Sequence, residues 1–368
     1  MKAALAEQLL LAVLGIDDLQ ELSAIRERIE TLTSLKFDSY EGYSAGVRFM
    51  ESLATWLSGF REEDRRAALD FVLDRLTFVS ATELDHLVSS VYPDILRPWL
   101  TDRAADLRGE SKWSRSALAK SPEFESLQRQ MLIVGMSDGA RLDKLRRSGP
   151  FSNEQFHPVA AIDKEKADGM IESLGEVMKE RGWDGPHAFN SVVVIDDFAG
   201  SGQTMLRKKK DAWVGRLPKI RAQLERMREL KLVTEDVRVL AVLYLVTDKA
   251  ALHLQNTMNA AGFDEPHWQV RWVHRFPPSF PLDDARDAAI RDLCNRYFSE
   301  SWQDQYTGTG GDLTYGYGGS ALPLVLHHNA PNNAPPIIWK VADPEIAEGS
   351  SGWRGVFPRH ERHHPRRA

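Results

Sequence analysis

The sequence predicts a mostly parallel α/β sheet that is preceded by an all-helical N-terminal region. Before about residue 100, apolar residues recur at helical spacing. Between about Glu123 and Tyr297, short apolar runs alternate with helical stretches. Such runs are typical of parallel strands that are buried on both faces. The length of 368 residues favours two domains with ample material for a core.

The helical region is expected over residues 1–108. One apolar stripe is formed by Phe49, Leu53, Trp56 and Leu57, and a second by Leu69, Val72, Leu73 and Leu76. Ser80 and Glu83 form a capping box at the start of a further helix. The polar stretch that follows predicts a linker over 109–122, an α/β domain over 123–345 and a basic, disordered tail over 346–368.

Strands and helices of the α/β region can be placed in order. A buried strand is expected at Met131–Gly135, and Asp163 is expected to cap a helix that ends at Arg181. The next strand, Ser191–Ile195, precedes two helices separated at Pro218. The later elements are a strand at Val237–Val246, a helix at Ala250–Ala261, a strand at Trp268–Val273 and an edge strand at Leu322–Leu326.

The segment Val192 to Met205, VVVIDDFAGSGQTM, has the strongest functional pattern. Asp196 and Asp197 follow the apolar run, at the carboxyl end where open parallel sheets bind ligands. The small residues Ala199 to Thr204 can surround an anion with backbone N–H groups at the start of a helix. The glycine-rich loops of P-loop and dinucleotide-binding proteins are absent from the sequence. The alternative is a purely structural turn.

This segment resembles the signature of the phosphoribosyltransferase family: four hydrophobic residues, two acids, two apolar positions and then Thr-Thr-Gly-x-Thr. The resemblance implies the type I phosphoribosyltransferase fold and a phosphoribosyl pyrophosphate ligand, with Asp196 and Asp197 bound to the ribose hydroxyls. The implied ribose and phosphate contacts are Ala199, Gly200, Ser201, Gly202, Gln203 and Thr204. Gly200 and Gln203 depart from the pattern, and phosphate binding tolerates this better than catalysis does.

The loop after the first strand, by the same resemblance, would bind pyrophosphate. Its candidate residues are Ser137, Asp138, Gly139, Arg141, Arg146 and Arg147. Asp138 repels pyrophosphate unless Mg²⁺ lies between them, so either the metal bridges there or the ligand is not a pyrophosphate. Alternatively, Asp138 and Gly139 form an ordinary turn beside solvated arginines.

The proline-rich segment Tyr315 to Trp339 is the third unusual feature. Asn329, Asn332 and Asn333 are candidates for a hood over a nucleobase or another acceptor, because nearby prolines fix the backbone. The alternative is that these asparagines only form turns. His327 and His328 lack the partner spacing of a metal site and are interpreted as strand-end residues.

Three segments together, GMSDGARLDKLRR, IDDFAGSG and HHNAPNNAPPIIW, resemble the phosphoribosyltransferase-like proteins of bacterial conflict and anti-phage gene neighbourhoods. The resemblance implies an enzyme that binds phosphoribosyl pyrophosphate or a nucleotide with Mg²⁺ as cofactor, and a role in anti-phage defence. The alternative is a non-catalytic nucleotide sensor that signals to a partner protein through its helical region.

Net charge and cysteine content bear on the possible partners of the protein and on its cellular compartment. The 47 basic and 53 acidic residues give a net charge of −6, which provides no general attraction to nucleic acid or membranes. The run Arg207 to Lys210 is expected on the solvated face of an early helical turn, and the basic tail Arg359 to Ala368 offers at most a weak nucleic-acid contact. No apolar run is long enough to span a membrane, and the single Cys294 fits a reducing cytoplasm.

Overall fold

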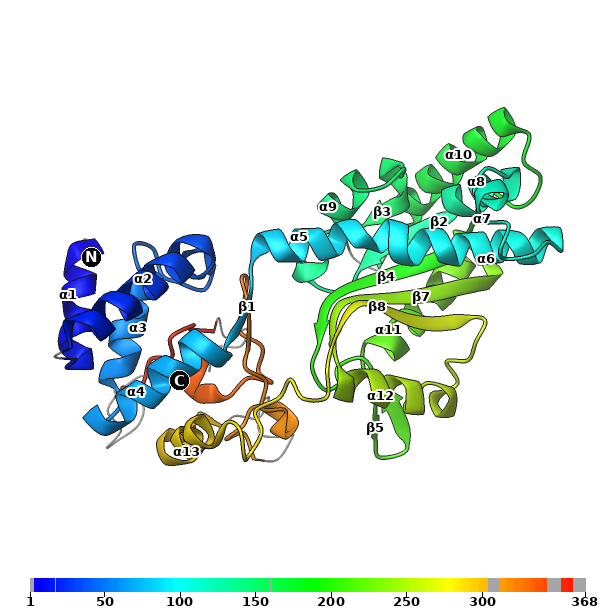
Figure 1. Cartoon of the computed structure of the whole chain (residues 1–368). Coiled ribbons are helices and arrows are strands. Elements are labelled where there is room, and N and C mark those ends of the chain that lie inside the picture. Colours follow the sequence, from blue (N-terminus) through cyan, green and yellow to red (C-terminus); the bar gives the residue numbers. More distant parts are fainter. Residues whose placement is uncertain (1–2, 17, 159–160, 304–311, 343–351, 360–368) are drawn as a thin grey trace. The chain divides into compact units, whose positions relative to one another are not determined.

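The computed structural model describes the chain except for residues 1–2, 17, 159–160, 304–311, 343–351 and 360–368 (Figure 1). The chain divides into two compact units. The first unit combines Met1–Glu83 with Pro278–Ala368, and the second is Leu84–Pro277. The helices expected in one region over 1–108 are therefore shared between two units, and the region expected over 123–345 is divided at Pro278.

The first unit is mostly helical, as expected for the N-terminal region. Its helices are α1 (Ala3–Leu14), α2 (Leu19–Leu35), α3 (Phe49–Ser58), α4 (Glu62–Asp70), α13 (Ala288–Tyr297) and α14 (Pro336–Trp339), with a π-helical turn at Phe71–Arg75. The all-helical prediction is wrong at one place, where β1 (Thr77–Val79) pairs in parallel with β9 (Leu324–Leu326). Thr77, Phe78 and Val79 are strand formers, and the Thr77 N–H donates to the Pro323 carbonyl at 2.8 Å.

The C-terminal segment contributes to the core of this unit. Phe357 is fully buried and stacks on Phe49 with ring centroids 5.6 Å apart. The Ser52 hydroxyl donates to the Val356 carbonyl at 2.8 Å. Residues 352–359 therefore differ from the disordered tail expected from residue 346, because Trp353, Val356 and Phe357 supply buried apolar surface. The rest of that expected tail, 346–351 and 360–368, lies outside the described residues.

A five-stranded parallel sheet forms the centre of the second unit, which confirms the predicted α/β class. Its order is β3-β2-β4-β7-β8, and each neighbouring pair is parallel. The strands are β2 (Met131–Gly135), β3 (Phe156–His157), β4 (Phe189–Ala199), β7 (Val233–Thr247) and β8 (Trp268–Phe276). Val192 to Ile195 are fully buried in β4, the central strand. The two residues of β3 were too few to be recognised from the sequence.

Helices cover both faces of this sheet. They are α5 (Ala81–Ser90), α6 (Arg97–Arg108), α7 (Arg115–Leu118), α8 (Pro122–Arg129), α9 (Leu142–Arg147), α10 (Lys164–Arg181), α11 (Arg216–Glu229) and α12 (Asp248–Thr257). Apolar side chains of α10, α11 and α12 share one core with alternate residues of β2, β4 and β7. Figure 1 shows α5 and α6 running across the sheet, and Arg103 of α6 donates to the Ser191 hydroxyl of β4.

The two helix caps predicted at Ser80 and Asp163 are confirmed. The Ser80 hydroxyl accepts from the Glu83 N–H at 3.2 Å, while Glu83 Oε2 accepts from the Ser80 N–H at 2.8 Å. The Asp163 carboxylate accepts from the Lys166 N–H at 2.8 Å. Within the described part of the chain, no helix is long and apolar enough to cross a membrane.

The prediction of two helices after the central strand is wrong. Residues 207–214 form an antiparallel hairpin of β5 (Arg207–Lys209) and β6 (Ala212–Val214), so Arg207 to Lys210 do not lie on a helical turn. A single helix, α11, follows the hairpin. Pro218 lies in its first turn, where an N–H group has no partner within the helix, so the proline does not interrupt it.

Candidate functional site

Asp196 and Asp197 lie where the central strand extends beyond its neighbour. The pairing of β2 with β4 ends at Gly135 and Ile195, whereas β4 stays paired with β7 as far as Ala199. In the sheet, β3 lies on one side of β2, and the next strand along the chain, β4, lies on the other side. The strand order therefore reverses between β2 and β4. Ligands bind at such reversal points in open parallel sheets.

The two acids face opposite sides of the sheet, since neighbouring residues of a strand alternate in direction. The Asp196 side chain is 1% exposed and forms an ion pair with the Arg216 guanidinium of α11. Asp197 is partly exposed and lies against Gly139, where an added Cβ would come within 2.6 Å of Asp197 Oδ2. Only glycine fits there without a shift of the Asp197 side chain or of the loop after β2.

Ser137 joins that loop to both acids. Its hydroxyl donates to Asp196 Oδ1 at 2.6 Å and lies 3.3 Å from Asp197 Oδ1. The neighbouring Met136 N–H donates to the Ile195 carbonyl at 2.8 Å. These contacts place Ser137 and Gly139 beside the two carboxylates, so four of the residues selected from the sequence lie together.

Tyr244 of β7 contacts the same loop. Its hydroxyl donates to the Ala140 carbonyl. Burial and then the nearby Asp197 charge raise the pKa of Tyr244 well above its usual value. The phenol therefore stays protonated and remains a hydrogen-bond donor.

The loop from Gly200 to Thr204 turns tightly around Gly202. The N–H groups of Met205 and Leu206 both donate to the Gly202 carbonyl at 3.0 Å, and the Thr247 hydroxyl donates to the Gly200 carbonyl at 2.6 Å. Gly202 has φ +73°, and an added Cβ would lie 2.8 Å from His253 Cδ2. Both the backbone angle and the lack of space require glycine.

Several N–H groups of this loop are available to a ligand. Within the described part of the chain, the N–H groups of Ser201, Gly202 and Thr204 donate to no protein acceptor. Ser201 is 6% exposed, and buried backbone donors without a partner are rare. Neighbouring N–H groups in a tight turn suit the oxygens of an anion.

Helix α11 starts beside the loop although the hairpin separates them in sequence. The Arg216 N–H donates to the Thr204 carbonyl at 3.0 Å, and the Leu217 N–H donates to the Met205 carbonyl at 3.1 Å. Gly215 has φ +135°, and a Cβ there would come 2.5 Å from the Met205 carbonyl oxygen. The helix that was expected directly after the loop is therefore replaced by α11, which starts beside the loop. This arrangement adds Arg216 to the site.

Arg216 was not selected from the sequence. An arginine that follows a glycine and precedes a helix carries no distinctive spacing. Its role depends on the hairpin, which returns the chain to the loop and brings the guanidinium to Asp196. Thr247 and Tyr244 were also missed, because both belong to the continuous apolar run of β7.

The predicted basic residues of the loop after β2 have other partners or are exposed. Arg141 Nη2 forms an ion pair with Asp85 Oδ1 of α5 at 3.0 Å, and Arg146 Nη1 donates to Asn153 Oδ1 at 2.5 Å. Arg147 is exposed. The backbone of Asp138 begins a short 3-10 turn, but its side chain lies outside what the structure describes.

The three hood candidates belong to the first unit, whereas the acids and the loop belong to the second. Asn333 is 7% exposed, and its amide donates to the Ser320 hydroxyl at 3.0 Å. The Asn332 carbonyl accepts from the Tyr317 N–H at 2.7 Å, and Asn329 exchanges backbone hydrogen bonds with Leu326. These contacts stabilise the turns of their own segment.

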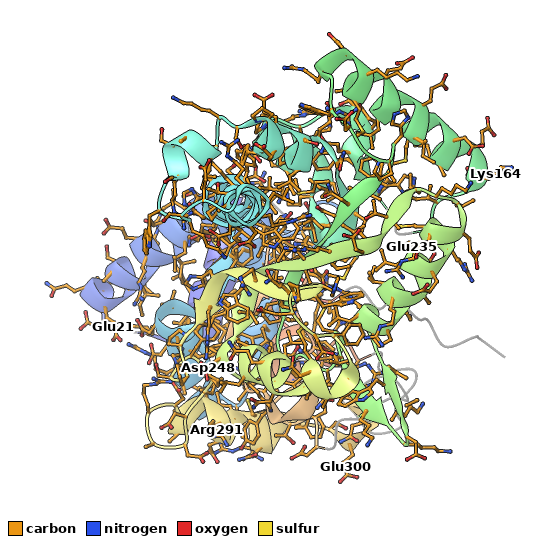
Figure 2. The ribbon with its side chains drawn as sticks, turned by 90° about the vertical axis from the view of Figure 1, so that its right-hand side faces the viewer. Glu21, Lys164, Glu235, Asp248, Arg291 and Glu300 are labelled. Carbon is orange, nitrogen blue, oxygen red and sulfur yellow. The ribbon has the colours of Figure 1, made fainter. Side chains whose placement is uncertain are left out.

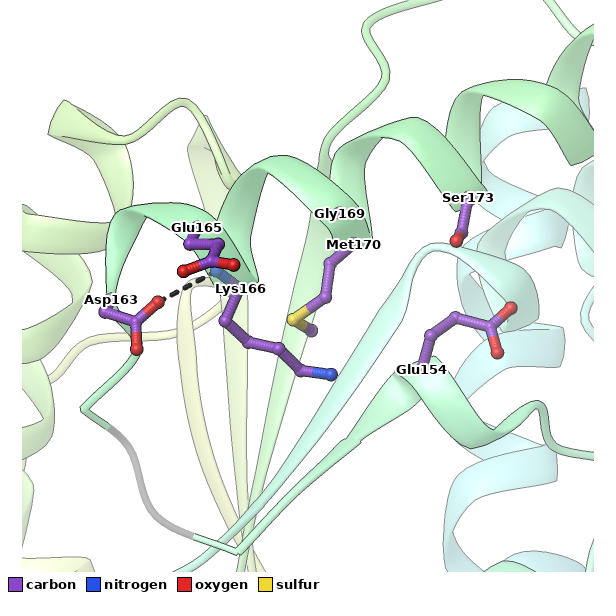
Figure 3. A pocket seen from close by; sticks show the side chains of 7 residues that line it. All are labelled: Glu154, Asp163, Glu165, Lys166, Gly169, Met170 and Ser173. Carbon is purple, nitrogen blue, oxygen red and sulfur yellow. Dashed lines mark hydrogen bonds between the residues drawn. The ribbon is translucent and has the colours of Figure 1, made fainter.

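A cavity of about 440 Å³ lies elsewhere in the second unit, between α10 and the 3-10 turn at Asn153–Gln155 (Figure 3). Three acids, Glu154, Asp163 and Glu165, line it together with Lys166. Figure 3 shows these side chains around an open space, with Asp163 engaged in capping its helix. None of the lining residues belongs to the loops described above, so this cavity is separate from the candidate site. Among the described residues, no group of three or more His, Cys, Asp or Glu side chains is arranged to hold a metal ion.

Comparison with known proteins identifies the family. No curated protein and no solved structure matches this chain. The family model PRTase-CE matches residues 53–359, well over half of the 368 residues. The match includes the loop after β2, the acids of β4 and the turn around Gly202, and it confirms the resemblance seen in the sequence. The chain therefore belongs to the PRTase-CE family, phosphoribosyltransferase-like proteins of conflict systems.

Proposed function

We propose that this protein binds a phosphorylated ribose, either phosphoribosyl pyrophosphate or a nucleotide, at the carboxyl edge of its sheet. The observation that carries the proposal is the meeting of Ser137, Asp196 and Asp197 beside a tight loop with available N–H groups. A phosphorylated ribose needs acceptors for its hydroxyls and donors for its phosphate, and this arrangement supplies both within one small region.

The phosphate would bind in the loop from Gly200 to Thr204. The N–H groups of Ser201, Gly202 and Thr204 would meet its oxygens. Gly200 replaces a hydroxyl residue of the family signature, so a side-chain donor is lost, but the backbone donor at this position remains. The ribose hydroxyls would donate to Asp197, the acid that is partly exposed, and to Asp196 where Arg216 leaves it room.

We further propose Mg²⁺ as a cofactor. Magnesium commonly keeps several waters and binds through one or two carboxylates together with the phosphates of the substrate, so a cage of protein ligands is not needed. Asp197 is partly exposed and has carboxylate oxygens, which are ligands that Mg²⁺ prefers. Asp138 is the next residue after Ser137, whose hydroxyl contacts Asp197. When bound, the ion would neutralise phosphate charge.

The proposed chemistry is the making or breaking of a bond at the anomeric carbon of the ribose. The transition state of such a reaction resembles an oxocarbenium ion, which nearby carboxylates stabilise without a covalent nucleophile. Asp197 would face the ribose, Ser137 would hold the carboxylates in position, and Arg216 would keep the charge of Asp196 balanced.

Two observations favour a second function, a non-catalytic sensor. Asp196 is already paired with Arg216 and nearly inaccessible, and Gly200 lacks the hydroxyl of the family signature. Both features are compatible with ligand binding and less favourable to turnover. A sensor would use the same site and pass the signal to a partner protein. In either case we propose a role in anti-phage defence, in the cytoplasm.

Isothermal titration calorimetry with phosphoribosyl pyrophosphate and Mg²⁺ tests the site. The double substitution Asp196→Asn with Asp197→Asn should abolish binding while circular dichroism shows an intact fold. The matched control is Glu235→Gln with Asp236→Asn, two adjacent acids at the amino end of β7 (Glu235 is labelled in Figure 2). Unchanged affinity in the first variant, or equal loss in both, would overturn the site. Release of pyrophosphate by the wild type separates the enzyme from the sensor.

A further inference from the structure

The hairpin β5–β6 carries four consecutive cations. Arg207, Lys208 and Lys209 form β5, and Lys210, at φ +54°, starts the turn with Asp211. All four basic residues are exposed. Figure 1 shows the hairpin extending away from the sheet next to α12. The chain thus holds a compact group of positive charge outside its packed layers.

These cations have few acidic neighbours, unlike several arginines elsewhere in the chain. Arg66, Arg108 and Arg296 each form ion pairs with two acids. Among the described residues, no ion pair joins Lys208, Lys209 or Lys210 to an acid. With Asp211 as the one acid of the hairpin, its local charge is four minus one, or +3, within a chain of −6. Such a local excess attracts polyanions.

An aromatic ring lies within the same surface. Trp213 of β6 pairs with Lys208 of β5, so their side chains share one face of the hairpin. Trp213 is only partly buried, and it packs on one side against the core of the second unit. Cations interleaved with an aromatic ring are typical of surfaces that bind single-stranded nucleic acid, because bases stack on the ring while phosphates meet the cations.

The hairpin is also attached to the loop of the candidate site. Arg207 Nη1 donates to the Gln203 carbonyl at 3.1 Å. Positive charge therefore continues outward from a loop suited to one phosphate. Alternate residues of an extended strand are about 6.8 Å apart, so Arg207 and Lys209 present two separated cations along the face opposite to Lys208 and Trp213. A single small nucleotide does not need this further row, whereas a chain of phosphates does.

We propose that the hairpin β5–β6 binds single-stranded nucleic acid, with Lys208, Lys209 and Lys210 at backbone phosphates and Trp213 stacked on a base. The partner follows from charge complementarity and from the aromatic ring that shares one face of the hairpin with Lys208. An anionic membrane would satisfy the charges but would not use a ring held against the protein core. The inference goes beyond the proposed ribose-phosphate site and does not require it.

Fluorescence anisotropy of a labelled single-stranded oligonucleotide of roughly 15 nucleotides tests this surface, with salt varied between about 50 and 200 mM. The full chain should bind with a slope of log K against log salt of about −2 to −3, as expected for three or four neutralised phosphates. Lys208→Gln with Lys209→Gln and Lys210→Gln should weaken binding at low salt by about tenfold or more and reduce the slope by about 2.

A matched control removes the same charge elsewhere in the second unit. Lys164→Gln with Lys166→Gln and Lys179→Gln changes three exposed lysines of α10, and Figure 2 shows Lys164 at the outer end of that helix. This variant should bind within about twofold of the wild type, because its lysines lie outside the hairpin. Equal losses in the two variants would mean that only net charge matters and would overturn the proposal.

Two further measurements separate the alternatives. Trp213→Leu keeps an apolar side chain but removes the stacking face, and it should weaken oligonucleotide binding about tenfold without changing the salt slope. Vesicles that contain phosphatidylserine serve as the competing partner. Hairpin-dependent binding to these vesicles without binding to the oligonucleotide would overturn the proposal.

The same variants distinguish this inference from the proposed function. The triple hairpin variant should retain its calorimetric affinity for phosphoribosyl pyrophosphate, because Arg207 and the loop are unchanged. The Asp196→Asn with Asp197→Asn variant should retain oligonucleotide binding. A wild-type chain that binds phosphoribosyl pyrophosphate but no oligonucleotide would refute the hairpin proposal alone.

Discussion

The Arg216 guanidinium forms an ion pair with Asp196, a carboxylate that is only 1% exposed. Arg216 is the first residue of α11. Its N–H donates to the Thr204 carbonyl, and this hydrogen bond holds the start of the helix beside the loop. A buried carboxylate is costly unless a partner balances its charge. The acid pair of this family signature is therefore asymmetric in this chain, since Asp196 is neutralised by the protein and Asp197 faces the loop after β2.

Substitution of Arg216 tests how much this ion pair contributes to the free energy of unfolding. Arg216→Gln should lower the free energy of unfolding by about 2 kcal/mol, measured by urea denaturation. The value lies below the usual range for breaking a buried pair because the Arg216 side chain is 24% exposed and water can reach it.

Arg228→Gln is a suitable comparison. Arg228 belongs to the same helix and is also 24% exposed, but its partner Glu225 is 61% exposed. Its loss should cost about 0 to 1 kcal/mol, as for surface ion pairs. Similar losses in the two variants would show that Asp196 does not depend on Arg216.

The central strand and its acids could be predicted because their signal is local. Four apolar residues, two acids and a small-residue loop follow one another without interruption, and the structure places them at the carboxyl edge of the sheet. The Arg216 contact was not predictable, because it depends on a hairpin. The run RKKKDAWV has a charge at every position of its first half and no alternation that marks a strand.

The pairing of β1 with β9 could not be predicted from the sequence either. Thr77 to Val79 and Leu324 to Leu326 are short, and their parallel pairing joins segments more than 240 residues apart. Periodicity reports which face of an element is buried, but it does not identify the partner. The helical character of the N-terminal region was predictable, and its association with the C-terminal segment was not.

Gly139 provides a second prediction, on the contact between the loop after β2 and Asp197. Gly139→Ala should destabilise the protein by about 1 to 3 kcal/mol and weaken phosphoribosyl pyrophosphate binding, because the new Cβ would press on the Asp197 carboxylate. Gly169→Ala is the control, since no atom lies within 4 Å of a Cβ there and the residue is inside α10. That change should raise stability by about 0.5 to 1 kcal/mol. A neutral Gly139→Ala would remove the argument for this close contact.

Asp287 gives a prediction on acid stability in the first unit. Burial opposes its ionisation, but hydrogen bonds from Arg286 and Arg75 outweigh that effect and lower the pKa of Asp287 to about 2. A folded pKa below the unfolded value of about 3.9 means that the stabilisation is complete above pH 4 and is lost as the pH falls through 2.

The expected result is a steeper loss of unfolding free energy between about pH 4 and 2 in the wild type than in Asp287→Asn. Urea denaturation at several pH values measures it. Asp284→Asn, which changes a neighbouring carboxylate that is 87% exposed, should follow the wild-type curve. Parallel curves for wild type and Asp287→Asn would contradict the assigned role of the Arg75 and Arg286 contacts.

The last prediction concerns Asp138, which follows the serine that contacts both acids of the candidate site. If Mg²⁺ bridges Asp138 to a pyrophosphate, chelation of the metal should weaken phosphoribosyl pyrophosphate binding strongly. Asp138→Asn should then reduce affinity more at low Mg²⁺ than at high Mg²⁺, because excess metal compensates for the lost ligand. If Asp138 instead repels the ligand, removal of its charge should improve affinity, since a like-charge contact in a partly desolvated loop costs on the order of 1 kcal/mol. We expect the first outcome, measured by calorimetry at the two metal concentrations. Tighter binding by Asp138→Asn at both would refute a pyrophosphate-using enzyme and would leave the nucleotide sensor as the function of this site.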